Sequence, residues 1–144
     1  MKKILPVSQT QTGTETTQFQ NLPTLSYFIH EIMFDFQKLE VYQKSRRMHK
    51  KVIQFLFKSK EVPPRLRDQL SRASLSVMLL IAEGAGRFTK ADKKHFYIQS
   101  RASAFETVAC LEACADLKFL SEAEFKLFND EYENISKMLF GLMR

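Results

Sequence analysis

Cys110 and Cys114 are the residues whose type and spacing could most directly support chemistry, as metal ligands or as a disulfide. They lie four positions apart on one face of an expected helix, a spacing that does not suggest a structural disulfide framework. A metal site would need further ligands such as His49 or His95, and the chain contains no metal-ligand motif. We therefore expect both thiols to be small core residues in a reducing compartment, with no metal and no cofactor.

Four charged residues, Glu83, Arg87, Arg101 and Glu106, are the other candidates for a shared role. Glu83 and Arg87 lie at the end of one expected helix, and Arg101 and Glu106 lie in the next. Because consecutive helices should run antiparallel, ion pairs between them would fix the register of the two helices. The functional alternative is that the two arginines face an anion.

The sequence lacks the motifs of the common enzyme classes. It has no phosphate loop, nucleophile elbow, Ser/His/Asp set or Glu-x-x-His pair. Catalytic carboxylates normally have convergent acid–base partners, which the sequence does not indicate. We expect a protein that is not an enzyme.

Composition and periodicity predict an all-α fold. The chain of 144 residues contains 4 Gly and 4 Pro, too few for a turn-rich β fold. Apolar spacing and end signals predict helices over residues 35–58, 64–83, 89–117 and 121–142. The end signals are an N-cap at Asp35, Pro64 in a first turn, a left-handed glycine stop at 84–86, an N-cap at Thr89, and a capping box formed by Ser121 and Glu124. Four long helices with short loops imply an antiparallel, up-down-up-down four-helix bundle.

The helix over residues 64–83 should lie at the centre of this bundle. One apolar stripe includes Leu70, Val77 and Ile81, and a second stripe makes the helix apolar nearly all round: Leu75, Met78, Leu79 and Ala82. The run is far too short to span a membrane, which needs about 20 apolar residues. In the following helix, the expected core residues are Phe96, Ile98, Ala102, Phe105, Ala109 and Leu111.

Positive charge is concentrated in the first long helix. The formal net charge is +6, and residues 35–62 alone carry eight cations and three anions. Helical spacing places Lys44, Arg47, Lys51 and Lys58 opposite the apolar side, with Lys50 flanking them and Glu40 as the one interruption. These five cations are the candidate binding residues for an anionic partner such as nucleic acid, and the plainer alternative is a solvated basic face.

Residues 1–33 differ in composition from residues 34–144. Met1–Leu5 is basic and then apolar but contains no signal-peptide core. Ser8–Gln20 is rich in Thr and Gln, which predicts disorder. Leu22–Phe34 is apolar and is expected to dock on the bundle or on a partner. The alternative is that residues 1–32 are not natural coding sequence and that Met33 is the true start.

Four segments carry a resemblance to a known family: Phe36–Ser45, Gln69–Ala73 with Ile81–Arg87, Arg101–Ser103 with Glu106, and Asp116–Ser121. They resemble motifs of the small four-helix-bundle proteins encoded in intervening sequences of bacterial 23S ribosomal RNA genes. The most specific is Q-L-x-R-A followed by I-A-E-G-x-G-R. The chain departs from the family at Met78–Leu80, where Pro-Ala-Asn is common, and at Val108, where a carboxylate is common.

This resemblance carries expectations about function. The family's fold is similar to that of the accessory variability determinant proteins of diversity-generating retroelements, which are basic pentamers that bind nucleic acid and a reverse transcriptase. The resemblance therefore implies a cytoplasmic bacterial homopentamer that binds nucleic acid, RNA in preference to DNA. The alternative is a protein-interaction or scaffold module, such as an accessory subunit of a reverse-transcriptase complex, which the acidic last helix and the apolar segment 22–34 also suggest.

Overall fold

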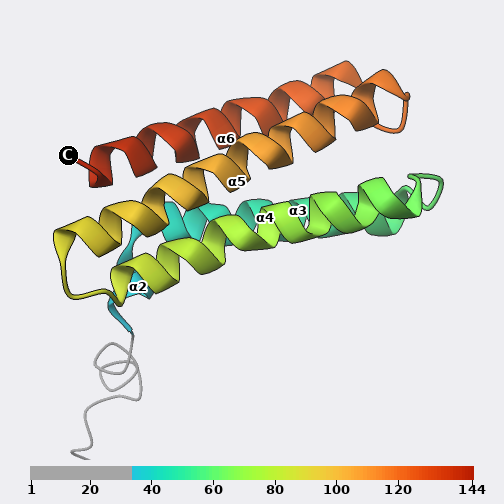
Figure 1. The fold of residues 1–144 in the computed structure, drawn as a ribbon. Coiled ribbons are helices and arrows are strands. Elements are labelled where there is room, and N and C mark those ends of the chain that lie inside the picture. Colours follow the sequence, from blue (N-terminus) through green and yellow to red (C-terminus); the bar gives the residue numbers. More distant parts are fainter. Residues whose placement is uncertain (1–33) are drawn as a thin grey trace, which may run out of the picture. The chain divides into compact units, whose positions relative to one another are not determined.

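The computed structural model describes residues 34–144, and this part of the chain is helical without strands, as predicted (Figure 1). The helices are α2 (Asp35–Lys38), α3 (Glu40–Lys58), α4 (Pro64–Ala85), α5 (Lys90–Asp116) and α6 (Glu122–Leu142). The chain divides into the units Met1–Met33 and Phe34–Arg144. The expectations of a disordered stretch, a docking segment and a start at Met33 concern residues 1–33 and so lie outside the described residues. No described helix combines the length and apolar character that crossing a membrane requires.

The first predicted helix is interrupted at Leu39. This residue has extended backbone angles (φ −69°, ψ 121°) and separates α2 from α3. The Gln43 side chain donates a hydrogen bond to the Gln37 carbonyl oxygen (2.9 Å), and the Phe36 ring packs edge-on against Tyr42 (4.8 Å between centroids). These contacts fold α2 back onto the start of α3. The predicted N-cap at Asp35 is wrong, because Phe34 occupies that position and Asp35 is the first helical residue.

The other helix starts agree with the sequence signals, whereas one predicted stop does not. Pro64 begins α4, the Thr89 hydroxyl accepts from the Asp92 amide (3.1 Å), and Ser121 and Glu124 form a reciprocal capping box. The predicted left-handed stop after α4 is wrong, because Gly86 has φ −77° and the right-handed conformation. The left-handed residue is instead Lys118 (φ 64°), which follows α5. Its position lets the Phe119 amide donate to the Cys114 carbonyl oxygen (2.9 Å) and close the turn into α6.

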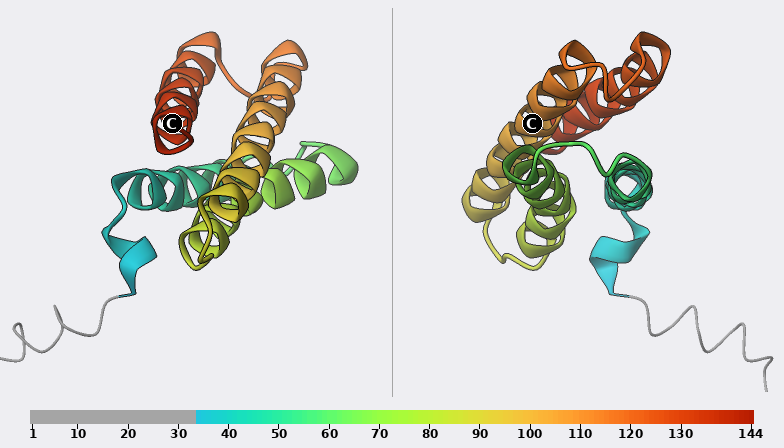
Figure 2. Two further views of the ribbon diagram at one scale, coloured as in Figure 1. Left: turned by 60° about the vertical axis from the view of Figure 1, so that its left-hand side comes forward. Right: turned by 90° about the vertical axis from the view of Figure 1, so that its right-hand side faces the viewer.

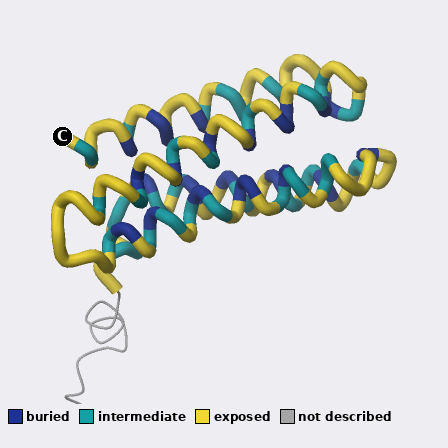
Figure 3. Tube along the Cα trace, viewed as in Figure 1, coloured by how far each residue is buried: buried dark blue, intermediate teal, exposed yellow. Residues whose placement is uncertain are grey.

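The four long helices form a ring of four contacts, α3 to α4 to α5 to α6 and back to α3. Figure 2 shows α3 beside α4 and α5 beside α6, with the two pairs crossing rather than lying parallel. The contact between α4 and α5 is the most extensive, and the contact between α3 and α6 is the least extensive. The buried positions of each helix face the other helices (Figure 3). The fully buried side chains come from all four: Val52, Leu70, Val77, Ile81, Leu111, Cys114, Tyr132, Ile135 and Leu139.

The prediction that α4 lies at the centre of the bundle, apolar nearly all round, is met on only part of its surface. Its first stripe is buried, with Leu70, Val77 and Ile81 fully covered. In the second stripe, however, Leu75 and Leu79 remain 37% and 52% exposed. The reason is that α4 contacts α3 and α5 on its two flanks and α2 near its end, so no long helix covers the side between them.

The predicted core of α5 is also largely wrong. Of the expected residues, Leu111 is buried and Phe96 is half-buried, whereas the rest are exposed: Ile98, Ala102, Phe105 and Ala109. The buried face of α5 instead carries mostly small or hydroxyl side chains: Tyr97, Ser100, Ala104, Thr107, Cys110, Leu111 and Cys114. The hydroxyls are satisfied by backbone, since Ser100 donates to the Val77 carbonyl oxygen and Thr107 to that of Ser103 (both 2.8 Å). Small side chains on this face allow α4 and α5 to approach closely.

Gly84 of α4 lies in close contact with α5. A Cβ atom at this position would lie 2.8 Å from Tyr97 Cε1 and 2.9 Å from Phe96 Cβ, closer than carbon atoms can pack. Glycine is therefore required here by the neighbouring helix and not by an unusual backbone angle.

Candidate nucleic-acid interface

Four cations lie together on the outer side of α3: Arg46, Arg47, Lys50 and Lys51. We call them the α3 basic face. All four are exposed, and none has an ion-pair partner within 4.0 Å among the described residues. Their spacing of three and four residues places them on adjacent turns of one helix surface. Arg46 was missing from the predicted set, although its position four residues before Lys50 is a signal that could have included it.

Lys44 belongs to a different environment from the α3 basic face. The sequence placed it opposite the apolar side, but its Nζ lies 2.8 Å from Glu131 Oε2 of α6, and its side chain is only 18% exposed. The acidic α6 therefore neutralises one of the five predicted binding cations within the chain. The prediction that Lys44 faces outward is wrong. It used the sequence of α3 alone, whereas the contact between α3 and α6 is what brings Glu131 to Lys44.

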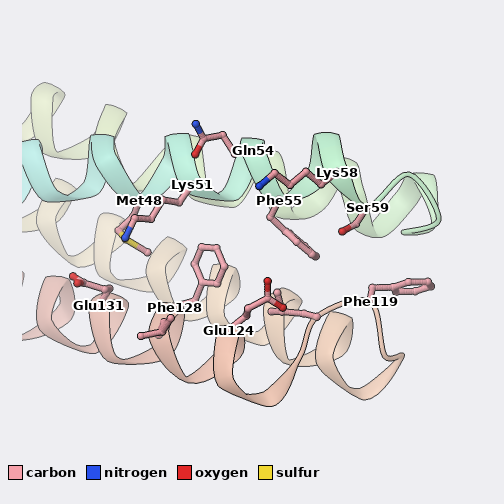
Figure 4. A pocket seen from close by; sticks show the side chains of 12 residues that line it. Met48, Lys51, Gln54, Phe55, Lys58, Ser59, Phe119, Glu124, Phe128 and Glu131 are labelled. Atoms are coloured by element: carbon pink, nitrogen blue, oxygen red, sulfur yellow. The ribbon is translucent and has the colours of Figure 1, made fainter.

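Lys51 and Lys58 line a groove that runs between α3 and α6 (Figure 4). The cavity has a volume of about 380 Å³. Its walls include Phe55 from α3 and Phe128 from α6, whose rings meet edge to face with centroids 6.4 Å apart. Phe119 and Leu120 close the end nearest the α5–α6 turn. The groove thus combines aromatic walls with cations along the α3 rim.

Glu124 and Glu131 provide the negative charge on the α6 side of the groove. Hydrogen bonds from the Ser121 side chain and backbone hold the pKa of Glu124 below its usual value, and the positive charge of Lys58 contributes in the same direction. Glu124 therefore stays ionised at neutral pH and completes the capping box of Ser121 at the start of α6. Glu131 is engaged by Lys44.

The four ion-pair candidates do not pair across α4 and α5 as expected. Glu83 and Arg87 pair with each other along the same helix end (2.5 Å), and the Arg87 guanidinium also lies over the Phe96 ring (4.4 Å). Glu106 accepts a hydrogen bond from Gln69 of α4, so a neutral amide provides the cross-helix link. The predicted set of cross-helix ion pairs is therefore wrong.

Arg101 points toward α6 rather than α4. Its Nε donates to the Ser136 hydroxyl (2.9 Å), and its guanidinium lies 4.7 Å from the Phe105 ring centroid and 6.0 Å from that of Phe140. Within residues 34–144 these contacts, and no carboxylate, hold the Arg101 guanidinium, and they link α5 to α6.

The cysteines are buried and free, as predicted. Burial raises the pKa of both thiols, to about 11 for Cys114, and the neighbouring charges of Glu106 and Cys110 add smaller upward shifts to Cys110 and Cys114 respectively. Both thiols therefore remain protonated at neutral pH, which disfavours nucleophilic or metal-ligating roles. Within residues 34–144, no three His, Cys, Asp or Glu side chains gather in a way that could hold a metal ion.

Comparison with known proteins agrees with the helical architecture. A solved structure from Bacteroides thetaiotaomicron VPI-5482, described as a protein with unknown function from the S23 ribosomal protein family, superposes with a TM-score of 0.67. The two chains are 20% identical, and the match covers 72% of this chain and 98% of that one, which supports a shared fold. Curated protein sequences yield no match. A sequence model of the 23S rRNA-intervening sequence protein family matches residues 37–141, which span the four long helices except for the last residue of α6. The chain belongs to the 23S rRNA-intervening sequence protein family.

Proposed function

We propose that this protein is a non-catalytic, homo-oligomeric nucleic-acid-binding protein that contacts the phosphates of RNA through the α3 basic face. Lys58 extends this surface along the groove beside α6, and Lys44 contributes through the stability of the α3–α6 seam rather than through direct contact. The family's association with ribosomal RNA genes supports RNA over DNA as the partner.

The observation that carries the proposal is the absence of carboxylate partners around the α3 basic face within residues 34–144. Six described cations have a carboxylate within 4.0 Å: Lys38, Lys44, Arg72, Arg87, Lys126 and Lys137. Other described cations, such as Lys90 and Lys94, are also unpaired, and the α3 basic face differs from them by gathering four unpaired cations on one helix surface. Arg46, Arg47, Lys50 and Lys51 keep their charge available on two adjacent turns of α3. A cluster of one sign attracts polyanions and steers their approach.

The lysine and arginine side chains of the α3 basic face would contact phosphates and not bases. Binding should therefore be weakly selective for sequence and steeply dependent on salt, because each neutralised phosphate releases counterions. Several copies of the α3 basic face in one oligomer would raise the affinity by avidity.

Charge reversal on α3 tests the proposal. Fluorescence anisotropy of a labelled structured RNA would compare the natural protein with the triple variant Arg47→Glu/Lys50→Glu/Lys51→Glu. The matched control is Lys90→Glu/Lys93→Glu/Lys94→Glu, which changes the net charge equally in the first turns of α5, where added acids favour the helix. We expect the α3 variant to bind at least tenfold more weakly than the control. Equal weakening by both variants would reject the α3 basic face as the site.

An exposed apolar stripe on α5 supports the homo-oligomeric part of the proposal. Ile98 and Phe105 are 50% and 53% exposed, and with Ala102 and Ala109 they recur at intervals of four, three and four residues. This spacing is typical of helices that pack against another helix. Exposed large apolar side chains that gather in one stripe often mark a surface that contacts another protein.

Native mass spectrometry tests the assembly. The family resemblance predicts five subunits, and Phe105→Glu should shift the protein toward the monomer because it places a charge in the packed stripe. Phe88→Glu is the matched control, since Phe88 is fully exposed in the α4–α5 loop. A natural protein that is monomeric at micromolar concentration would contradict self-association and would favour the second candidate function, in which the α5 stripe binds a different protein.

A further inference from the structure

The groove between α3 and α6 has the size and lining of a ligand site. Its volume of about 380 Å³ falls within the range of about 300–1,000 Å³ that is usual for small-ligand pockets. It exists because α3 and α6 share the least extensive contact in the bundle. Figure 4 shows side chains from both helices pointing into the space between them.

The walls of the groove present aromatic surface. Phe55 and Phe128 are both half-buried and both line the cavity, and Phe119 closes one end. Leu127, which is largely exposed, lies on the α6 side of the opening. A flat aromatic group would gain stacking and burial against such walls.

The rim of the groove is electrically asymmetric. On the α3 side, Lys51 and Lys58 have no ion-pair partner within 4.0 Å in the described part of the chain. On the α6 side, Glu131 is already bound to Lys44, and Glu124 is held by Ser121. The two lysines therefore favour an anionic group at the α3 rim, above the aromatic walls.

We infer that the groove holds one unpaired nucleotide of a bound RNA, with its base against Phe55 and Phe128 and its phosphate at Lys51 and Lys58. This inference rests on the proposed function and adds to it a preference for single-stranded segments. A base inside a duplex is already stacked between its neighbours, whereas an unpaired base is free to stack on an aromatic side chain. Since every base has a π-face, such a site would tolerate any sequence.

The Lys51 side chain joins this groove to the α3 basic face. Lys51 belongs to the exposed cluster and also lines the cavity. An RNA strand that follows Arg47 and Lys50 along α3 would therefore bring its backbone to the mouth of the groove. This continuity makes a nucleotide of the same strand the natural occupant.

A fluorescent base tests the inference. A short single-stranded RNA that contains 2-aminopurine would be titrated with the full-length protein, beside the same strand in a perfect duplex. We expect the fluorescence of the single strand to change when the protein binds, and an affinity for it that Phe128→Leu weakens about fivefold to a hundredfold, as for loss of a stacked base. Phe57→Leu is the matched control, because Phe57 is 75% exposed on α3 and does not line the groove.

A second variant avoids any ambiguity from misfolding. Glu124→Gln removes a negative charge from the groove, while glutamine can still complete the capping box with Ser121. We expect this variant to bind single-stranded RNA about twofold to fivefold more tightly, a gain that a damaged fold would not produce. Unchanged or weaker binding would count against a phosphate beside Lys58.

The outcomes separate this inference from the proposed function. Equal binding of single strand and duplex, with no effect of Phe128→Leu, would overturn the groove assignment but leave phosphate binding by α3 intact. Absence of binding to either RNA would overturn both. Competition by free adenosine monophosphate as strong as that by the oligonucleotide would overturn the assignment to an RNA strand.

Discussion

The Lys44 ammonium group lies 2.8 Å from the Glu131 carboxylate and joins the first and last long helices of the bundle. This ion pair divides the basic residues of α3 into two groups. Lys44 is directed into the fold, whereas Arg46, Arg47, Lys50 and Lys51 are directed outward without carboxylate partners among the described residues. We therefore predict that substitution of Lys44 changes mainly the stability of the fold, whereas substitution of the outward-facing cations changes mainly RNA binding.

Substitution of Lys44 should affect stability and leave RNA binding nearly unchanged. We expect Lys44→Ala to keep its RNA affinity within about twofold of the natural protein. A double-mutant cycle with Glu131→Gln, measured by urea denaturation, should give a coupling free energy of about 0.5–1 kcal/mol, since Glu131 is partly exposed and the pair is screened. A coupling near zero would show that the pair does not persist in solution.

Gly84 should tolerate no larger residue, unlike nearby Gly86. Although alanine favours helix by up to about 1 kcal/mol over glycine, the Gly84→Ala methyl group would lie within 3.0 Å of Tyr97 and Phe96. We expect a net loss of about 1–3 kcal/mol from overpacking, observed as a lower melting temperature. Gly86→Ala is the control, because its nearest neighbour would be 3.6 Å away, and it should be neutral or stabilising. Equal melting temperatures for the two variants would contradict the close contact of α4 and α5.

The half-buried His49 should make stability depend on pH near neutrality. Burial lowers the pKa of this imidazole, and its Nδ1 lies 2.9 Å from the Ser74 hydroxyl oxygen of α4. Below about pH 6.5 the unfolded chain takes up the proton before the folded chain does. Stability should therefore be unaffected by this group above that pH, decline as the pH falls below it, and level off below the folded-state pKa. Thermal melts from pH 7.5 to 5 should show a weaker decline for His49→Gln than for His95→Gln, which alters an exposed histidine; identical profiles would refute the assignment.

The Tyr132 hydroxyl should be dispensable for stability. Tyr132 is 1% exposed, and its buried hydroxyl has no hydrogen-bond partner among residues 34–144. It lies near Thr107, whose hydroxyl donates to the Ser103 carbonyl oxygen (2.8 Å), but the two hydroxyls do not have the geometry of a hydrogen bond. Because an unsatisfied buried hydroxyl is unfavourable, Tyr132→Phe should leave the free energy of unfolding unchanged or raise it by about 1 kcal/mol. A loss greater than about 1 kcal/mol in urea denaturation would indicate that the hydroxyl has a partner in solution.

The helices and most of their starts were predictable because local chemistry determines them. Ser121 and Glu124 form the capping box that their spacing predicts, and Pro64 begins α4. The break at Leu39 was not predictable, since it depends on the packing of Phe36 against Tyr42 and on the Gln43 hydrogen bond to Gln37. Hydrophobicity alone favours a continuous helix there.

The side of each helix that faces the core was less predictable. In α5, the buried face carries mostly small or hydroxyl side chains packed against α4, so the large apolar side chains Ile98 and Phe105 were wrongly assigned to the core. The position of Lys44 likewise depends on Glu131, which lies far away in the sequence. The composition of α3 showed that it is basic. Which of its cations are paired could be known only once the position of α6 was known.

The salt dependence of RNA binding tests the central claim, that the α3 basic face contacts phosphates, most directly. The slope of the logarithm of the association constant against the logarithm of salt concentration reports how many phosphates are neutralised. We expect a clearly negative slope for the natural protein, and a slope shallower by about one unit in each of the single variants Arg47→Ala, Lys50→Ala and Lys51→Ala. Lys94→Ala, on α5, should leave the slope unchanged. Identical slopes for the natural protein and all three α3 variants would contradict the account.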